Sequence, residues 1–430
     1  MFSIETKPAE DMEATNTARL LPGPGQANAR SVGAVTPPSG ARILSDSGEA
    51  LSLTVAPSLD ALAADWQALQ ERAPVSPYQT FDLAESWVRH AAEAAGFEVR
   101  IGVLRDAGDE VVMILPFGLV RRLGTTVGVY LGGSHFNVNM PLVDPSLRLG
   151  PDAVIRIFDA YCRMTGADLL HLGNQPVEWR NAEHPFLCMP HYGAPDDNRF
   201  INVAHGDYET YFANQLTRKM RSQLRRKAMK FADAGVVSAR RATTPEDVES
   251  FLTAFLDQKS KRLAAQGFDD TFALPGVKEF LLEAALSGLS GTGGMELRVF
   301  EVDGYPLSVR GGVRHGDHHS LMLQSFDDHN ALSKYSPGEC LLAEVLINNC
   351  KHGVTSFDFG VGDGRFKKVW SNGVVELFNL THGASKKGQL HASLIRLTEA
   401  ATRYIKRNPR LFSAVQEARA LGARLRGRTE

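Results

Sequence analysis

Hydrophobic residues follow two different periods along this chain. In ALSLTVA (50–56) and MELRVFEVDG (295–304) they recur at every second position, which predicts half-buried strands. In SLDALAADWQALQERA (58–73) and TPEDVESFLTAFLDQKSKRLAAQG (244–267) they recur every third or fourth position, which predicts amphipathic helices. Because the two patterns alternate along most of the chain, the sequence predicts an α/β fold with mixed sheets flanked by helices.

The order of these elements repeats once. Each half predicts a strand, two helices, a three-strand meander, a helix and a strand, and the crossovers at 155–174 and 343–363 align. We therefore predict two similar domains, over residues 49–200 and 201–390. Residues 1–48 are rich in Gly, Pro, Ser and Ala without apolar periodicity, which predicts a disordered leader. Residues 391–430 are predicted to form a basic helical tail.

Composition narrows the classes of protein that remain. The chain is 43% hydrophobic and has a net charge of -2, so any site for a polyanion must be a local patch. No run approaches the roughly 20 apolar residues that span a bilayer, and the N-terminus lacks the apolar core of a secretory signal. The four cysteines lack zinc spacing, and strand alternation separates His318 from His319. We expect a cytoplasmic protein with reduced thiols and no metal.

The strongest local charge signal lies in TRKMRSQLRRKAMKF (217–231). Apolar residues recur there at helical spacing, and basic residues surround them without one acidic residue. This predicts a basic helix whose face, including Arg221 and Arg225, binds a substrate polyanion such as CoA phosphates, a lipid-linked or nucleotide sugar, or tRNA. A merely basic surface explains the same pattern. The tail adds nine Lys or Arg against two Glu over 396–428, which suits a membrane surface or a synthase complex.

The stretch YSPGECLLAEVLINNCKHGVTSFDFGVGDGRFKKVW (335–370) resembles GNAT acyltransferases. The tandem order resembles FemAB-type transferases, and more closely the CelD/BcsL-type proteins associated with cellulose and exopolysaccharide loci. That family has a Ser-Pro-Gly helix start, a strand ending in Asp-Phe-Gly-x-Gly-Asp and an aromatic-lysine pair, where Phe366 stands for the usual Tyr. The resemblance implies two tandem GNAT-like domains over about 50–390, with the active site in the second. It also implies acetyl-CoA or another acyl-CoA as co-substrate. We predict that Gln324 is among the cofactor-binding residues and that Tyr335 is the acid for the leaving thiolate.

The helix start at Ser336 is a candidate phosphate site. Ser336 is predicted to be the N-cap, Pro337 to open the first turn and Glu339 to complete a capping box. Free N–H groups at such a helix start favour an anion, and in a GNAT-like fold the CoA pyrophosphate would lie here, near Gly338. The usual glycine-rich phosphate loop is absent, so a purely structural helix remains an equal interpretation.

The stretch SFDFGVGDGRFKKVW (356–370) predicts a strand that delivers a glycine-rich turn into the cleft. Asp363 is the predicted general base, although an ordinary Asp-Gly turn would explain this residue as well. Lys367 and Lys368 are predicted to hold phosphate or stabilise an oxyanion. Asp358 is predicted either to bind substrate or to be a buried structural carboxylate.

Taken together, these residues predict an acyltransferase that moves an acetyl group to an amine or hydroxyl of a sugar or cell-envelope precursor. Two alternatives stay open. One is a FemAB-like transferase that takes its acyl group from aminoacyl-tRNA, which the basic helix favours. The other is a non-catalytic accessory protein of polysaccharide biosynthesis, which the missing phosphate loop favours.

Overall fold

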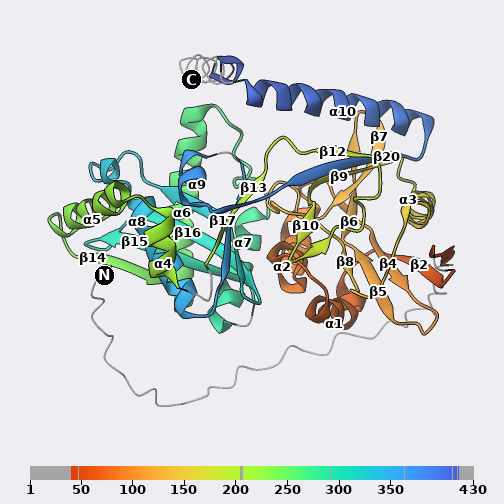
Figure 1. Cartoon of the computed structure of the whole chain (residues 1–430), viewed down its shortest axis with the longest axis horizontal. Coiled ribbons are helices and arrows are strands. Elements are labelled where there is room, and N and C mark those ends of the chain that lie inside the picture. The colour runs from red at the N-terminus through yellow and green to blue at the C-terminus, as the bar shows by residue number, and fades with distance from the viewer. Residues whose placement is uncertain are drawn as a thin grey trace, which may run out of the picture.

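Two α/β lobes lie side by side in the computed structural model, and one long C-terminal helix runs along the outer edge of the first lobe (Figure 1). The structure describes residues 40–46, 48–203, 207–291, 293–362, 364–408, 410–413 and 415. No helix in these residues is both long enough and apolar enough to cross a membrane.

The first lobe is built on two sheets and a short hairpin. The five-stranded sheet has the order β1-β2-β4-β5-β8, from Ala41–Leu44, Ala50–Ala56, Ile101–Arg105, Val111–Leu115 and Leu142–Val143. The six-stranded sheet has the order β12-β20-β9-β7-β6-β3, from His191–Gly193, Leu377–Gly383, Leu169–Pro176, Thr125–Tyr130, Phe117–Arg122 and Glu98–Val99. The hairpin joins β10 (Glu178–Trp179) to β11 (Ala182–Glu183), and the helices are α1 (Ala63–Arg72), α2 (Phe81–Trp87) and α3 (Pro151–Thr165).

The second lobe is built on one seven-stranded sheet in the order β14-β15-β16-β17-β18-β13-β19. Its strands are Val237–Arg241, Met295–Val302, Tyr305–His315, His318–Phe326, Ser356–Val361, Asn198–Asn202 and Gly373–Val375. Its helices are α4 (Tyr208–Gln215), α5 (Arg218–Ala232), α6 (Pro245–Gln266), α7 (Val277–Ser287), α8 (Pro337–Lys351) and α9 (Arg365–Trp370). The long C-terminal helix is α10 (Lys386–Arg407).

Alternating residues of the second sheet bury two separate faces. Val299 and Val309 pack with the α6 and α7 side chains, whereas Phe300 and Leu307 pack with α8 and α5. The first of these clusters also contains Trp66 and other aromatic side chains of the first lobe. The two lobes therefore share one continuous apolar core on the sheet face that packs against α6 and α7.

The predicted repeat of strand-helix-strand units is confirmed. In the first lobe β7 and β9 are parallel and α3 joins them, and in the second lobe β17 and β18 are parallel and α8 joins them. The local signals also hold: the α6 helix starts at a Thr244 cap that accepts from the Asp247 N–H and ends at Gly267 in the left-handed region. The fold is thus the mixed α/β class that the sequence predicts.

The two lobes exchange strands, which the sequence did not predict. β13 leaves the first lobe and pairs between β18 and β19 of the second. β20 returns from the second lobe and pairs between β12 and β9 of the first, and α10 packs against β20, β7 and β9. The domain boundary expected at residue 200 therefore falls within β13, and the one expected at residue 390 falls after β20, within α10. Each exchanged strand pairs with the sheet that satisfies its backbone hydrogen bonds.

The two terminal segments also differ from expectation. Residues 41–44 of the leader expected over 1–48 form the strand β1, which pairs with β2 through Ala41↔Leu53 to Leu44↔Ala50. Residues 1–39 and 47 lie outside the described residues. The tail expected over 391–430 begins within α10, which is packed on the first lobe, and residues 416–430 lie outside the described residues.

Candidate active site

The parallel strands β17 and β18 separate at their carboxyl ends. Their pairing runs from His318↔Ser356 to Ser320↔Asp358, although β17 continues to Phe326 and β18 to Val361. Ligands in α/β sheets bind beyond the carboxyl ends of parallel strands, where backbone groups are not used by a neighbouring strand. This opening is therefore the first place to look for a site.

A pocket of about 200 Å³ occupies this opening. Both strands contribute to it, together with the α6 helix, the loop after α6, the α9 helix and a loop of the first lobe. The lining residues include Leu321, Gln324, Phe359, Val361, Lys367, Lys259, Phe272, His135 and Asn137. The site thus lies between the lobes, and two residues that the sequence assigned to cofactor binding, Gln324 and Lys367, lie in it together.

Lys367 places a buried ammonium group in the pocket wall. Its side chain is 6% exposed, and Nζ donates to the carbonyl oxygens of Gly360 at 2.8 Å and Val361 at 2.9 Å. Burial lowers the pKa of Lys367 to about 8, while the nearby Asp358 carboxylate acts in the opposite direction. An ammonium group has three donors, so one remains for an oxygen in the pocket.

Glycines let the β18 end approach the first lobe. Gly360 has a φ of +68°, and a Cβ there would lie 2.8 Å from Asn137 Nδ2. Asn137 Nδ2 donates to the Tyr78 hydroxyl at 2.8 Å, and that hydroxyl donates to the Leu321 carbonyl at 3.1 Å. Burial raises the pKa of Tyr78 well above its ordinary value, so the phenol stays protonated. The first lobe therefore closes one side of the pocket with neutral hydrogen-bonding groups.

The sequence did not single out Tyr78, Asn137 or Lys259. The first two come from the other repeat, and Tyr78 contacts a residue 243 positions away in sequence. No local pattern marks such a contact. Lys259 lies on the α6 helix with its ammonium 5.5 Å from the Phe272 ring centroid, and burial lowers its pKa. A lysine within an amphipathic helix gives no signal that distinguishes it from a surface residue.

Asp358 lies beneath the pocket and is fully buried. Its carboxylate accepts from His318 Nε2 at 2.9 Å, from the Ser320 hydroxyl and from the Gly360 N–H at 2.7 Å. Since a carboxylate can only accept, the Nε2 atom of His318 carries a proton. These contacts fit the structural alternative for Asp358 and leave it without exposed surface for a substrate.

Asp358→Ala should destabilise the protein by about 3 kcal/mol, because it leaves the buried His318 and Ser320 donors without their acceptor. Urea unfolding followed by circular dichroism measures the change. Asp257→Ala is the matched control, since this exposed carboxylate pairs with Lys261 on the α6 surface and should contribute about 0.5 kcal/mol or less. Equal stability of the two variants would contradict a structural role for Asp358.

The α8 start differs from the predicted capping box. Ser336 has a φ of +59° and its side chain does not cap the helix. Instead, the Lys227 ammonium donates to both side chains, with Nζ 3.1 Å from Ser336 Oγ and 2.6 Å from Glu339 Oε2. The capping-box prediction is wrong, because the left-handed backbone at Ser336 and the cation on the α5 helix draw these side chains away from the first turn.

A buried arginine lies directly beneath this helix start. Arg310 Nη2 donates to the Gly338 carbonyl at 3.2 Å, and Nε and Nη1 have no partner among the described residues. Burial lowers the pKa of Arg310 to about 10, because removing the guanidinium from water disfavours its charged form. Its guanidinium lies 5.8 Å from the Phe366 ring centroid. Arg310, Lys367 and Lys259 together make the surroundings of the pocket favourable to an anion or a developing oxyanion.

The other predicted site residues that the structure describes are not among those that line the pocket. Tyr335 packs against the Phe231 ring at a centroid distance of 6.0 Å, and Lys368 is exposed on the α9 helix. Arg221 donates to the carbonyl oxygens at the end of the α4 helix, whereas Arg225 is exposed on the α5 helix. Asp363 lies outside the described residues.

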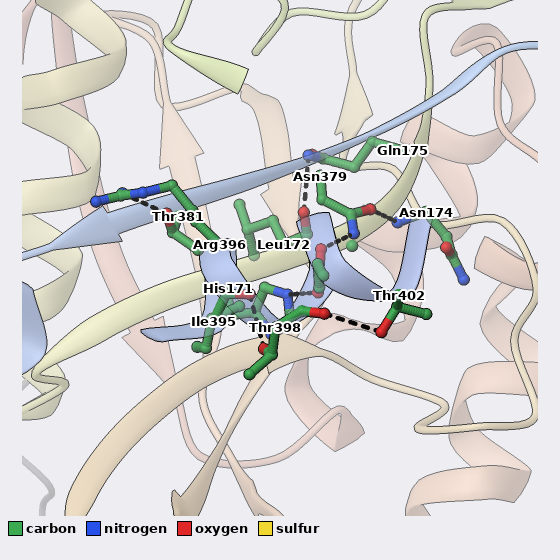
Figure 2. A network of polar contacts seen from close by, with 12 residues as sticks. His171, Leu172, Asn174, Gln175, Asn379, Thr381, Ile395, Arg396, Thr398 and Thr402 are labelled. Atoms are coloured by element: carbon green, nitrogen blue, oxygen red, sulfur yellow. Dashed lines mark hydrogen bonds and ion pairs between the residues drawn. The ribbon is translucent and has the colours of Figure 1, made fainter. Parts of the chain in front are cut away.

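At the corresponding strand ends of the first lobe, polar side chains bridge neighbouring segments. Figure 2 shows the polar contacts that tie β9 to β20 and α10: Asn379 Oδ1 accepts from the Asn174 N–H at 2.8 Å, and Gln175 lies alongside. The Gln175 side chain accepts from the Tyr130 hydroxyl at 2.9 Å, and Asn139 Nδ2 donates to the Gly173 carbonyl at 3.1 Å. The first lobe repeats the fold, but its strand end is used for packing.

Comparison with known proteins identifies the second lobe. Residues 218–368 match the family model described as an acetyltransferase (GNAT) domain. This segment runs from the α5 helix through α9 and contains the strand opening and Lys367. The second lobe is therefore a GNAT-type acyltransferase domain. The chain matches no curated protein.

The chain is similar to several solved structures. The chain is similar to the crystal structure of FemX, with a TM-score of 0.54 and 14% identity over 77% of this chain and 98% of that chain. A tandem GNAT protein from the clavulanic acid biosynthesis pathway matches with a TM-score of 0.46 and 12% identity over 78% and 99%. L-PGS from Bacillus licheniformis matches with a TM-score of 0.46 and 11% identity over 78% and 99%. At 14% identity the likeness to FemX shows the fold alone.

Proposed function

We propose that this GNAT-type domain transfers an acyl group, acetyl from acetyl-CoA first among the candidates, to an amine or hydroxyl of a sugar or cell-envelope precursor. The observation that carries the proposal is the pocket between the separated ends of β17 and β18, with the Lys367 ammonium in its wall. A thioester carbonyl bound there would meet a preorganised hydrogen-bond donor. A CelD/BcsL-type role in exopolysaccharide or cellulose synthesis is the narrower form of this proposal.

The proposed chemistry is direct attack in a ternary complex. The acceptor nitrogen or oxygen forms a bond to the acyl carbon, the carbonyl oxygen takes up charge beside Lys367, and the carbon-sulfur bond breaks. Asp363 would accept the proton of the acceptor, and Tyr335 would protonate the leaving thiolate. Ser336, Gly338 and Lys368 are proposed for the donor phosphates. The Arg310 guanidinium atoms that have no partner among the described residues support an anion near the same helix start.

One observation favours a second donor, an aminoacyl-tRNA. The outer surface of the α5 helix is lined by exposed basic side chains, namely Arg218, Lys219, Arg225, Arg226 and Lys230. Such a stripe suits the phosphate backbone of a nucleic acid, whose binding would fall steeply with salt. A non-catalytic accessory role in polysaccharide biosynthesis is the third candidate, and it predicts no binding of either donor in the pocket.

Thermal unfolding with about 1 mM acetyl-CoA tests the first donor, with AMP at equal concentration as control. At 100 times its dissociation constant a ligand stabilises the native state by about 2.7 kcal/mol. We expect a rise in Tm with acetyl-CoA that AMP does not reproduce. Absence of a shift, together with salt-sensitive tRNA binding that needs the α5 arginines, would transfer the proposal to aminoacyl-tRNA. Absence of both would leave the accessory role.

A further inference from the structure

The α10 helix carries its most exposed apolar side chains on the face turned away from the protein. Leu390 is 75% exposed, Leu397 68%, Tyr404 67% and Leu394 46%. These positions follow the spacing i, i+4, i+7 and i+14, which places them on one side of a helix. The stripe from residue 390 to 404 is about 21 Å long at helical rise.

Polar contacts fix the opposite face of α10 to the first lobe. Glu399 accepts from Asn379 Nδ2 at 2.5 Å and pairs with His171 Nε2 at 2.9 Å, and Arg396 Nη1 donates to Thr381 Oγ1 at 3.0 Å (Figure 2). Ala392 is buried on this inner face. A surface helix of a globular protein usually turns its apolar stripe inward. Here the hydrogen bonds hold the helix so that the leucines face outward.

Positively charged residues flank both ends of the apolar stripe. Lys386 precedes it, and Arg407 and Arg410 follow it, all exposed. Over residues 396–428 the sequence has nine Lys or Arg against two Glu. A basic helix with outward leucines and a tyrosine has the chemistry of a segment that lies in the headgroup region of an anionic bilayer. A second copy of this chain would bring the same positive charge to the contact, which opposes self-association through this face.

We propose that α10 docks this protein on an anionic lipid surface, with Leu390, Leu394, Leu397 and Tyr404 inserted below the headgroups. The occupant of this face is the lipid surface, and the flanking basic residues supply the electrostatic attraction. The docking is peripheral and reversible, and it goes beyond acyl transfer, because it needs neither the pocket nor a bound donor. An acceptor carried by a lipid would be delivered at the same surface.

Co-sedimentation with sonicated vesicles tests the proposal on the full chain. We expect binding to vesicles of phosphatidylglycerol and phosphatidylcholine, weak binding to phosphatidylcholine alone, and loss of binding as salt screens the attraction. The double variant Leu390→Gln/Leu397→Gln should weaken binding about tenfold or more, since two apolar side chains no longer enter the bilayer. Glutamine keeps helix propensity, and both positions are exposed, so Tm should be unchanged.

Leu123→Asn is the matched control. Leu123 is 78% exposed on a turn of the first lobe with a φ of 48°, so the change removes an exposed leucine elsewhere at a position that suits asparagine. It should bind vesicles as the wild type does. Failure of the wild type to bind anionic vesicles would overturn the proposal, as would equal binding by the double variant. Wild-type dimers that the double variant abolishes, without vesicle binding, would assign the face to a second copy.

Discussion

Lys367→Met is expected to lower the rate of acyl transfer by about 10² to 10³, the loss seen when a preorganised donor to an oxyanion is removed. Methionine fills a similar volume without the ammonium, and the Gly360 and Val361 carbonyls lose their 2.8 and 2.9 Å contacts. The measurement is thiol release from acetyl-CoA in the presence of an acceptor. If Lys367 acts on the transition state, kcat falls while the donor KM changes little.

Lys261→Met is the control for this change. Lys261 lies on the α6 surface in an exposed ion pair with Asp257, so its loss should affect neither rate nor stability by a measurable amount. A Lys367→Met variant with full kcat but a raised donor KM would show that Lys367 binds phosphate rather than the oxyanion. Full activity with an unchanged donor KM would show that Lys367 has no role in catalysis or donor binding.

The same variant has a signature in the pH dependence of stability. The pKa of Lys367 is about 8 in the folded protein against an ordinary value of 10.5, because burial disfavours the charged form. Between these values the unfolded chain holds more protons, so the wild-type free energy of unfolding rises with pH across this window. The rise attributable to Lys367 is at most about 3 kcal/mol, and Lys367→Met should lack it. Urea unfolding at pH 7 to 10 measures the difference.

The rate of acyl transfer should depend on pH in the opposite direction. It should fall as pH rises through 8, because Lys367 then loses the proton that stabilises the oxyanion.

Local signals were enough to predict most single elements. The basic pattern over 217–231 corresponds to α5, the Thr-capped pattern over 244–267 to α6, and the strand predicted at the start of 356–370 to β18. Each of these depends on residues within one turn or one strand. The α9 helix was missed, because six residues after a glycine-rich turn are too few to show a helical period.

Partnerships between distant segments could not be predicted in the same way. β13 and β20 each have an ordinary strand pattern, but nothing in either pattern says which sheet accepts it. The same limit applies to the site, where Lys367 lies in a motif that the sequence marks locally, while Tyr78 and Asn137 enter from the other repeat. The sequence around Ser336 fits an N-cap, but in the structure its side chain accepts from the Lys227 ammonium of α5 instead of capping the helix.

Truncation after Glu376 tests the strand exchange and should have the largest effect on stability. It removes β20, whose pairing with β9 runs from Leu377↔Pro176 to Gly383↔Leu169, and it removes α10. Phe378 and Leu380, each 1% exposed, leave the core of the first lobe. Deleting two such side chains costs about 5 to 10 kcal/mol, which equals the total stability of an ordinary domain.

We therefore expect this truncated chain to lose the first lobe, and the second lobe with it, because Trp66 of the first lobe and Phe255 of the second pack in one core. Circular dichroism should show no cooperative thermal transition, and limited proteolysis should leave no resistant fragment from either lobe. Truncation after Asn408 is the control, since it keeps β20 and all of α10 and should leave Tm within a few degrees. If the shorter chain keeps a protease-resistant second lobe with its own sharp transition, the lobes are independent and the exchanged strands only tether them. Loss of both lobes together would instead mean that the pocket exists only in the strand-exchanged pair, since Asn137 and Tyr78 reach it from the lobe that β20 completes.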